Sequence, residues 1–79
     1  MNNDQGAEPM YRRIYDSILA DISSGKLLPG DRVPSEKELS SRFSVSRITS
    51  KHALELLAGN KIIERFPGKG SFVARPEIA

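Results

Sequence analysis

The sequence predicts a small α+β domain that is mainly α-helical, with three helices and a C-terminal two-stranded β hairpin. Apolar residues recur at three- and four-residue spacing within residues 9–58, which is the period of amphipathic helices. Serines stand where the second and third helical segments begin, as helix N-caps do. After residue 60 the pattern changes to two β-prone runs separated by turn residues. The 79 residues fit one domain of this kind.

The first helix is predicted over about residues 9–24, after a polar segment, residues 1–8, that reads as a flexible N-terminus. Pro9 suits a first helical turn, and Gly25 suits the left-handed conformation that ends many helices. One apolar stripe runs along this segment and is expected to pack inward. Its members are Tyr11, Ile14, Tyr15, Ile18, Leu19 and Ile22.

The second helix is predicted over about residues 36–42. Pro34 disfavours helix in the residues before it, so residues 32–33 form at most a very short extended piece. Ser35 and Glu38 have the spacing of a capping box, in which each side chain bonds the backbone of the other residue. Capping and the negative charge that a helix start favours explain Glu36 and Glu38 better than general acid–base chemistry does.

The third helix is predicted over about residues 47–58, with Ser46 as its N-cap and an end near Gly59 and Asn60. Its inward face carries Ser50, Ala53, Leu54 and Leu57. Because only a short break at Ser44, Val45 and Ser46 separates it from the second helix, residues 36–55 form a helix-turn-helix candidate. In that motif the start of the second of the two helices lies against base edges in the major groove of DNA.

Residues at the start of the third helix have the chemistry that such a groove requires. An arginine can bond two acceptors of guanine, hydroxyls can meet phosphate or bases, and an apolar side chain can touch a thymine methyl group. The candidate residues are Ser46, Arg47, Ile48, Thr49 and Lys51. Each also has a simpler interpretation as a helix cap or as an ordinary exposed side chain.

The hairpin is predicted from runs at residues 62–65 and 71–74, so that the hairpin spans residues 62–74. Its loop places Lys69 between Gly68 and Gly70, a basic tip with little side-chain bulk. Such a tip, the wing of a winged helix-turn-helix, can approach the DNA backbone or the minor groove. The alternative is that these glycines only permit a tight turn.

Composition and charge limit the other classes of protein. The chain lacks cysteine, which excludes disulfides and thiolate metal sites, and it has one histidine, His52. It shows no apolar run of about 20 residues and no signal-peptide pattern. Residues 1–31 carry three basic and five acidic side chains, whereas residues 32–79 carry nine basic and five acidic ones. The basic half favours a polyanionic partner, with a plain charged surface as the alternative.

Three ordered stretches carry a resemblance to a known family. They are residues 29–39 (PGDRVPSEKEL), residues 45–57 with Val45, Ser46, Arg47, Thr49, Ala53, Leu54 and Leu57, and residues 68–73 (GKGSFV). Together they resemble the N-terminal winged helix-turn-helix of the GntR family of bacterial transcription regulators, over residues 9–75. The resemblance implies DNA contacts by Lys37, Ser46, Arg47, Ile48, Thr49, Lys51 and Gly68, to which the hairpin adds Lys69 and Gly70.

The resemblance also implies a cytoplasmic repressor or activator, with a metabolite-responsive repressor as the favoured interpretation, that binds a pseudo-palindromic double-stranded operator as a homodimer. A larger C-terminal domain would dimerise and bind a small-molecule effector, and residues 76–79 would begin the linker to it. No cofactor is implied. Dimerisation is expected to come from that further domain, because the 79 residues leave no long apolar surface for a dimer interface.

Four positions differ from the residues that are usual in the family. Valine is usual at Ser50, where a hydroxyl weakens the buried stripe unless it bonds to the backbone. Arginine is usual at Lys37 and Lys51, and lysine favours phosphate contact over base readout because it lacks the two-pronged donor. Glycine is usual at Lys61, so Asn60 is expected to supply the left-handed turn there.

A fold alone does not decide a function, so the sequence is also compared with what two other functional classes require. A winged helix that contacts protein would present an apolar patch at the start of the third helix, and there only Ile48 is apolar. An enzyme would need a nucleophile–base pair, a phosphate-binding loop or a metal-ligand set, and the sequence offers none of these.

Overall fold

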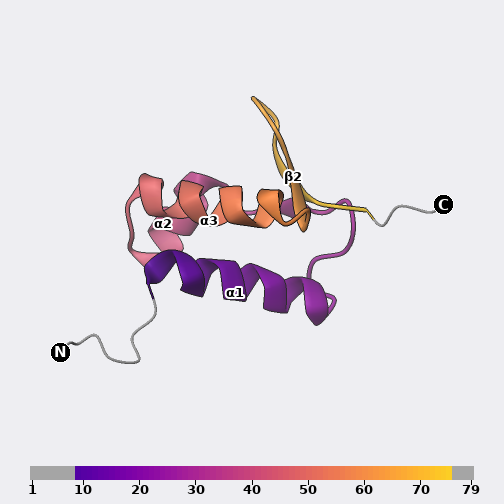
Figure 1. Cartoon of the computed structure of the whole chain (residues 1–79), viewed down its shortest axis with the longest axis horizontal. Coiled ribbons are helices and arrows are strands. Elements are labelled where there is room, and N and C mark those ends of the chain that lie inside the picture. Colours follow the sequence, from indigo (N-terminus) through magenta and orange to yellow (C-terminus); the bar gives the residue numbers. More distant parts are fainter. Residues whose placement is uncertain (1–8, 76–79) are drawn as a thin grey trace.

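The computed structural model describes residues 9–75, which form three α-helices and a three-stranded antiparallel sheet (Figure 1). In chain order the elements are α1 (Met10–Ser23), β1 (Arg32–Val33), α2 (Glu36–Phe43), α3 (Arg47–Gly59), β2 (Ile63–Phe66) and β3 (Gly70–Val73). The predicted α+β class with a winged helix-turn-helix is therefore confirmed. The predictions made for residues 1–8 and 76–79 fall outside the described residues.

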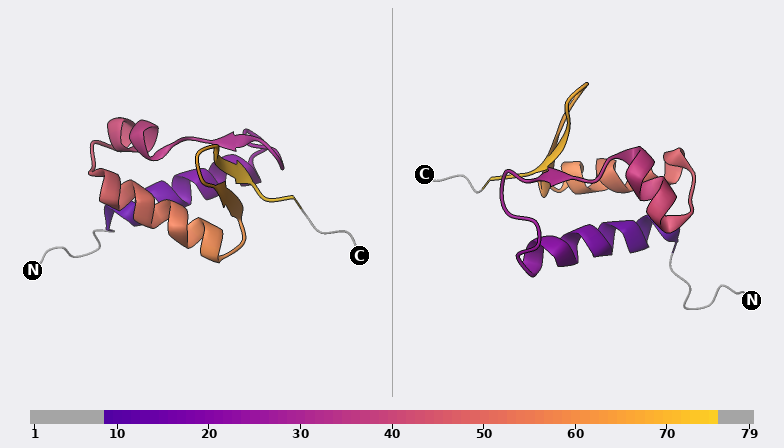
Figure 2. Two further views of the ribbon diagram at one scale, coloured as in Figure 1. Left: turned by 90° about the horizontal axis from the view of Figure 1, so that it is seen from above. Right: turned by 180° about the vertical axis from the view of Figure 1, so that it is seen from behind.

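Helices α1 and α3 pack along one another, α2 packs against α3, and the β2–β3 hairpin projects from the end of α3 (Figures 1 and 2). Every helix and every strand contributes to one core. Its fully buried apolar members are Ile14, Ile18, Val33, Leu39, Ala53, Leu54, Leu57, Ile63 and Val73. Tyr11, Tyr15 and Ile22 of the predicted stripe lie partly buried against this core. Leu19, which was expected to pack inward with them, is exposed instead.

Local capping explains where the helices begin and end. Gly25, directly after the last turn of α1, has φ +87°, the left-handed conformation expected there. At α2, the Ser35 hydroxyl accepts from the Glu38 N–H at 3.1 Å, and the Glu38 carboxylate accepts from the Ser35 N–H at 2.8 Å. The predicted capping box is therefore confirmed. Helix α2 continues one residue further than predicted, and Ser44 ends it in the left-handed region at φ +55°.

The connection between α3 and β2 differs from the prediction. Asn60 has φ −92°, and Lys61 takes the left-handed conformation at φ +62°. The expectation that Asn60 would supply this turn is therefore wrong. The Asn60 amide instead donates a hydrogen bond of 2.8 Å to the Tyr15 hydroxyl, which ties the end of α3 to α1.

Ser50 is completely buried where α2 and α3 meet. Its hydroxyl lies 2.9 Å from the hydroxyl of Ser40 on α2. A buried hydroxyl without a hydrogen-bond partner would be costly. The Ser40 side chain, rather than the expected backbone group, gives the Ser50 hydroxyl its partner.

The sheet has a third strand beyond the predicted hairpin. Strand order is β1-β3-β2, and β1 pairs with β3 so that Arg32 faces Phe72 and Val33 faces Ser71 (Figure 2). Backbone bonds of 2.9 Å, from the Gly30 N–H to the Val73 carbonyl and from the Val73 N–H to the Asp31 carbonyl, hold β1 in place. The hairpin is thereby joined to the segment that leads into α2. Within residues 9–75, no helix has the length and apolar character that crossing a membrane requires.

Candidate nucleic-acid interface

The start of α3 presents polar side chains to solvent. The Ser46 hydroxyl accepts from the Thr49 N–H at 3.1 Å and lies 3.1 Å from the Thr49 hydroxyl, so Ser46 caps the helix as predicted. Arg47, Ile48 and Lys51 are exposed, and Ile48 is 79% exposed. This exposure agrees with a contact to a thymine methyl group and equally with the simpler interpretation of Ile48 as an ordinary exposed side chain.

The opposite face of α3 is anchored in the core. Ala53, Leu54 and Leu57 are buried there together with Ser50. Because the residues that point inward are fixed by this packing, the side chains at the start of the helix have a defined direction relative to the rest of the domain. The basic and apolar faces of α3 are the ones that its sequence predicts.

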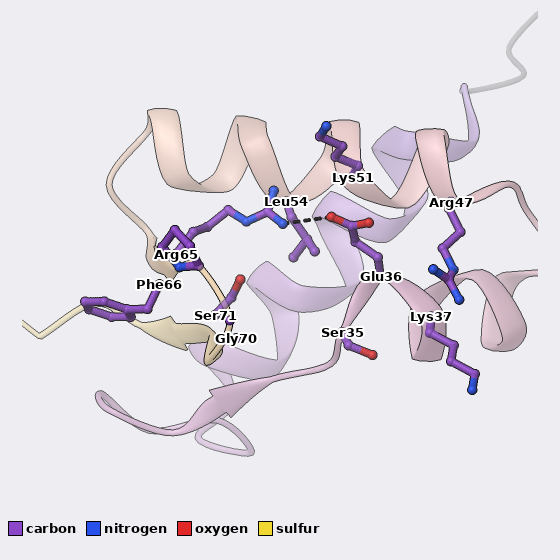
Figure 3. A pocket seen from close by; sticks show the side chains of 12 residues that line it. Ser35, Glu36, Lys37, Arg47, Lys51, Leu54, Arg65, Phe66, Gly70 and Ser71 are labelled. Carbon is purple, nitrogen blue, oxygen red and sulfur yellow. Dashed lines mark hydrogen bonds and ion pairs between the residues drawn. The ribbon is translucent and has the colours of Figure 1, made fainter.

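A groove of about 730 Å³ opens between α2, α3 and the hairpin (Figure 3). Five of the sequence-predicted residues line it, from three separate segments of the chain. They are Lys37, Arg47, Lys51, Gly68 and Gly70. The groove is also lined by Ser35, Glu36, Leu54, Arg65, Phe66, Pro67 and Ser71. The structure therefore brings the second helix, the third helix and the wing to one surface, as recognition of a single ligand requires.

The other four predicted residues lie outside the lining of this groove. Ser46, Ile48 and Thr49 are at the beginning of α3, and Lys69 is at the exposed tip of the hairpin. Their positions extend the candidate surface beyond the groove at the start of the helix and at the wing tip.

The wing turn needs its glycines for conformational reasons. The Lys69 N–H donates to the Phe66 carbonyl at 2.9 Å, which closes a four-residue turn with Pro67 and Gly68 in the middle. Gly68 has φ +77°, as the third position of a type II turn requires, and Gly70 has φ +120°. A Cβ added at Gly68 would have no atom within 4 Å, so the space beside this residue is open.

Arg65 and Glu36 are groove residues that the sequence analysis missed. The Arg65 guanidinium of β2 donates to the Glu36 carboxylate of α2 at 2.8 Å (Figure 3). The alternation of a strand could have indicated the position of Arg65, because alternate residues share a face. Arg65 is therefore on the same face of β2 as Ile63, which is buried. Glu36 had been interpreted only as a charge at a helix start, and no local pattern links residues 29 positions apart.

The charged side chains that line the groove are mostly cations. Lys37, Arg47, Lys51 and Arg65 line the groove as cations, whereas Glu36 is the one carboxylate that lines it among the described residues. Glu38 lies outside the groove. Its hydrogen bonds to the backbone and side chain of Ser35, with the charges of Arg32 and Arg42 adding less, lower the pKa of Glu38 below its ordinary value.

Residues 10–73 match the bacterial regulatory proteins of the gntR family. The chain belongs to this family. The match covers all three helices and the whole sheet, so the winged helix-turn-helix described above is the DNA-binding domain of a GntR-family protein.

Several GntR-family repressors are similar in sequence. The mannosyl-D-glycerate transport/metabolism system repressor MngR of Escherichia coli (strain K12) is 40% identical over 73 residues, which cover 92% of this chain and 30% of MngR. The histidine utilization repressor of Pseudomonas aeruginosa is 42% identical over 69 residues, which cover 87% of this chain and 28% of that protein. The chain thus spans less than a third of the length of these relatives.

Solved GntR-family structures have the same fold. The structure of AraR(DBD) in complex with operator ORE1 superposes with a TM-score of 0.86 at 32% identity, covering 94% of this chain and 89% of that one. YtrA from Sulfolobus acidocaldarius, a GntR-family transcription factor, superposes with a TM-score of 0.75 at 33% identity, covering 91% and 60% of the two chains.

Proposed function

We propose that this chain recognises an operator in double-stranded DNA as part of a bacterial transcription regulator, and that the start of α3 enters the major groove. The observation that carries the proposal is that Lys37, Arg47 and Lys51 line one groove together with Gly68 and Gly70 of the wing turn. A major groove about 12 Å wide admits a helix with its side chains. A wing beside that helix then meets the adjacent backbone or minor groove.

The proposed roles follow from each side chain's chemistry and exposure. Arg47 is exposed and can donate two hydrogen bonds to one guanine. Ile48, the most exposed large apolar side chain of the described residues, meets a thymine methyl group. Lys37 and Lys51 contact phosphates as point charges.

The remaining site residues hold the DNA backbone. Ser46 and Thr49 present their hydroxyls near the start of α3, where a helix favours phosphate. In the wing, Gly68, Lys69 and Gly70 bring a narrow, positively charged turn to the duplex. These contacts position the domain, whereas the α3 side chains read the sequence.

The protein to which this domain belongs is proposed to be a cytoplasmic repressor rather than an enzyme. The sequence relatives are named as repressors, and this chain spans less than a third of their length. We expect the rest of such a protein to supply a homodimer and a small-molecule effector site. Two copies of the domain would then read the two halves of a pseudo-palindromic operator.

The experiment is selection of bound fragments from a bacterial genomic library, followed by fluorescence anisotropy on the selected duplex. Arg47→Ala is expected to weaken binding to that duplex by about 1–3 kcal/mol, or about 5- to 150-fold. Arg13→Ala is the matched control, because Arg13 is exposed on α1 and outside the groove.

Equal affinities for Arg47→Ala and Arg13→Ala would mean that α3 does not read the operator. Absence of any bound duplex at low and at moderate salt would instead favour a winged helix that contacts protein.

A further inference from the structure

The ion pair between Glu36 and Arg65 lies within the groove that we propose for DNA (Figure 3). Arg65 reaches from β2 to Glu36 at the first position of α2, with a nitrogen–oxygen distance of 2.8 Å. Both side chains are 30% exposed. A carboxylate on this surface faces the same side as the cations that would meet phosphate, so it opposes binding of any duplex.

Stability gives a weak reason for placing a carboxylate there. An ion pair that remains partly open to water is screened, and both side chains lose freedom when they form it. A negative charge at the first position of α2 suits the helix dipole, but Glu38 already supplies a carboxylate at this helix start and caps it together with Ser35. The position of Glu36 therefore calls for an explanation in terms of binding.

We propose that Glu36 occupies the Arg65 guanidinium and withholds it from phosphate, and that it thereby limits the sequence-independent part of the affinity for DNA. This inference rests on the proposed function of the groove. An arginine that binds phosphate strengthens binding to every duplex alike, because that contact carries no sequence information. By neutralising Arg65 within the chain, Glu36 lowers the affinity for unrelated DNA and for the operator alike, while base reading stays with Arg47 and Ile48 of α3.

The test is the salt dependence of binding to a duplex of scrambled sequence, measured by fluorescence anisotropy with the 79-residue chain. Each phosphate contact adds about 0.9 to the slope of log affinity against log salt. Glu36→Gln keeps a hydrogen-bond acceptor for Arg65 but removes the charge. We expect its slope to be steeper than the parent's by about 0.9, so that its advantage in affinity shrinks about 3.5-fold between about 50 and 200 mM salt.

Glu55→Gln is the matched control. Glu55 is exposed on α3 and lies outside the groove lining, and its replacement changes the net charge by the same amount. We expect the slope of Glu55→Gln to equal that of the parent. The double variant Glu36→Gln/Arg65→Gln, which has no guanidinium to release, is expected to return to the parent slope.

Arg65→Gln separates this proposal from the view that Arg65 already contacts phosphate. Under the proposal its slope equals that of the parent, and its affinity is lower because Glu36 is left without its partner. A slope shallower by about 0.9 would overturn the proposal, since Arg65 would then be an ordinary phosphate contact. This variant also provides the test if Glu36→Gln fails to fold.

Two further outcomes distinguish this proposal from the proposed function. If the parent binds DNA and Glu36→Gln has the same slope as Glu55→Gln, the role of Glu36 is overturned while operator binding stands. If the parent binds neither scrambled nor genomic DNA, the proposed function fails and this inference fails with it.

Discussion

Replacement of Gly68 by alanine tests the wing separately from the stability of the fold. Gly68 has φ +77°, and an added Cβ would have no atom within 4 Å. The cost of alanine therefore arises from the left-handed backbone, at about 1–2 kcal/mol, less about 0.4–1 kcal/mol for reduced freedom of the unfolded chain. We expect a loss of about 1 kcal/mol in the free energy of unfolding.

Gly25 provides a matched comparison at a position away from the wing and the groove. It has φ +87°, and an added Cβ would likewise have no atom within 4 Å. It follows α1 and does not line the groove. Gly25→Ala is therefore expected to lose about the same stability as Gly68→Ala, again from the left-handed backbone alone.

DNA affinity should separate the two variants. A methyl group at Gly68 would stand between the turn and a duplex in contact with it. We therefore expect Gly68→Ala to bind DNA about tenfold more weakly than Gly25→Ala, which corresponds to about 1.4 kcal/mol. Urea unfolding measures stability, and anisotropy on one duplex measures affinity at a temperature where both variants are folded. If Gly68→Ala binds as tightly as Gly25→Ala, the wing does not touch DNA and its glycines serve the turn alone.

Three other predictions concern stability and are checked by urea unfolding. Ser50→Ala and Ser40→Ala should each lower the free energy of unfolding by about 1 kcal/mol, and the double variant should lose less than the sum because both remove one hydrogen bond. Lys61→Gly should raise it by about 0.5–1 kcal/mol, because glycine accepts φ +62° without strain. The lowered pKa of Glu38 stabilises the fold above the ordinary value of 4.5, and this contribution is lost as pH falls through the lowered pKa. Stability should therefore fall more in acid for the parent than for Glu38→Gln.

Each of these stability predictions has a clear contrary result. Full additivity of the two serine substitutions would show that their hydroxyls do not stabilise each other. A destabilised Lys61→Gly would mean that the lysine side chain contributes more than its backbone conformation costs. Identical acid dependence for the parent and Glu38→Gln would show that the capping carboxylate is not linked to folding.

Much of the fold was predictable from the sequence because its signals are local. The helix starts at Ser35 and Ser46 depend on partners three residues away, and the structure confirms both. The apolar face of α3 follows from its period, which places Leu54 and Leu57 in the core. The turn at Gly68 likewise follows from Pro67 and glycine in adjacent positions.

Other features depended on contacts between distant segments. The two residues of β1 become a strand only because β3 supplies their partners, so no pattern within residues 32–33 could reveal a third strand. The backbone of Lys61 adopts the left-handed conformation that was expected at Asn60, whose amide bonds Tyr15 from 45 positions away. The conformational preference of a residue carries no information on which distant segment of the chain it will contact.

The candidate site likewise has features that the sequence predicts and features that depend on contacts between distant segments. The sequence alone determined which residues could meet DNA at the start of α3 and in the wing, because cation, hydroxyl and glycine patterns are readable one segment at a time. Only the tertiary structure decided that Lys37, Arg47 and Lys51 share a groove with the wing, and that Glu36 pairs with Arg65 there. The physical reason is that a shared surface and an ion pair are set by packing between segments, which brings together charges that lie far apart along the chain.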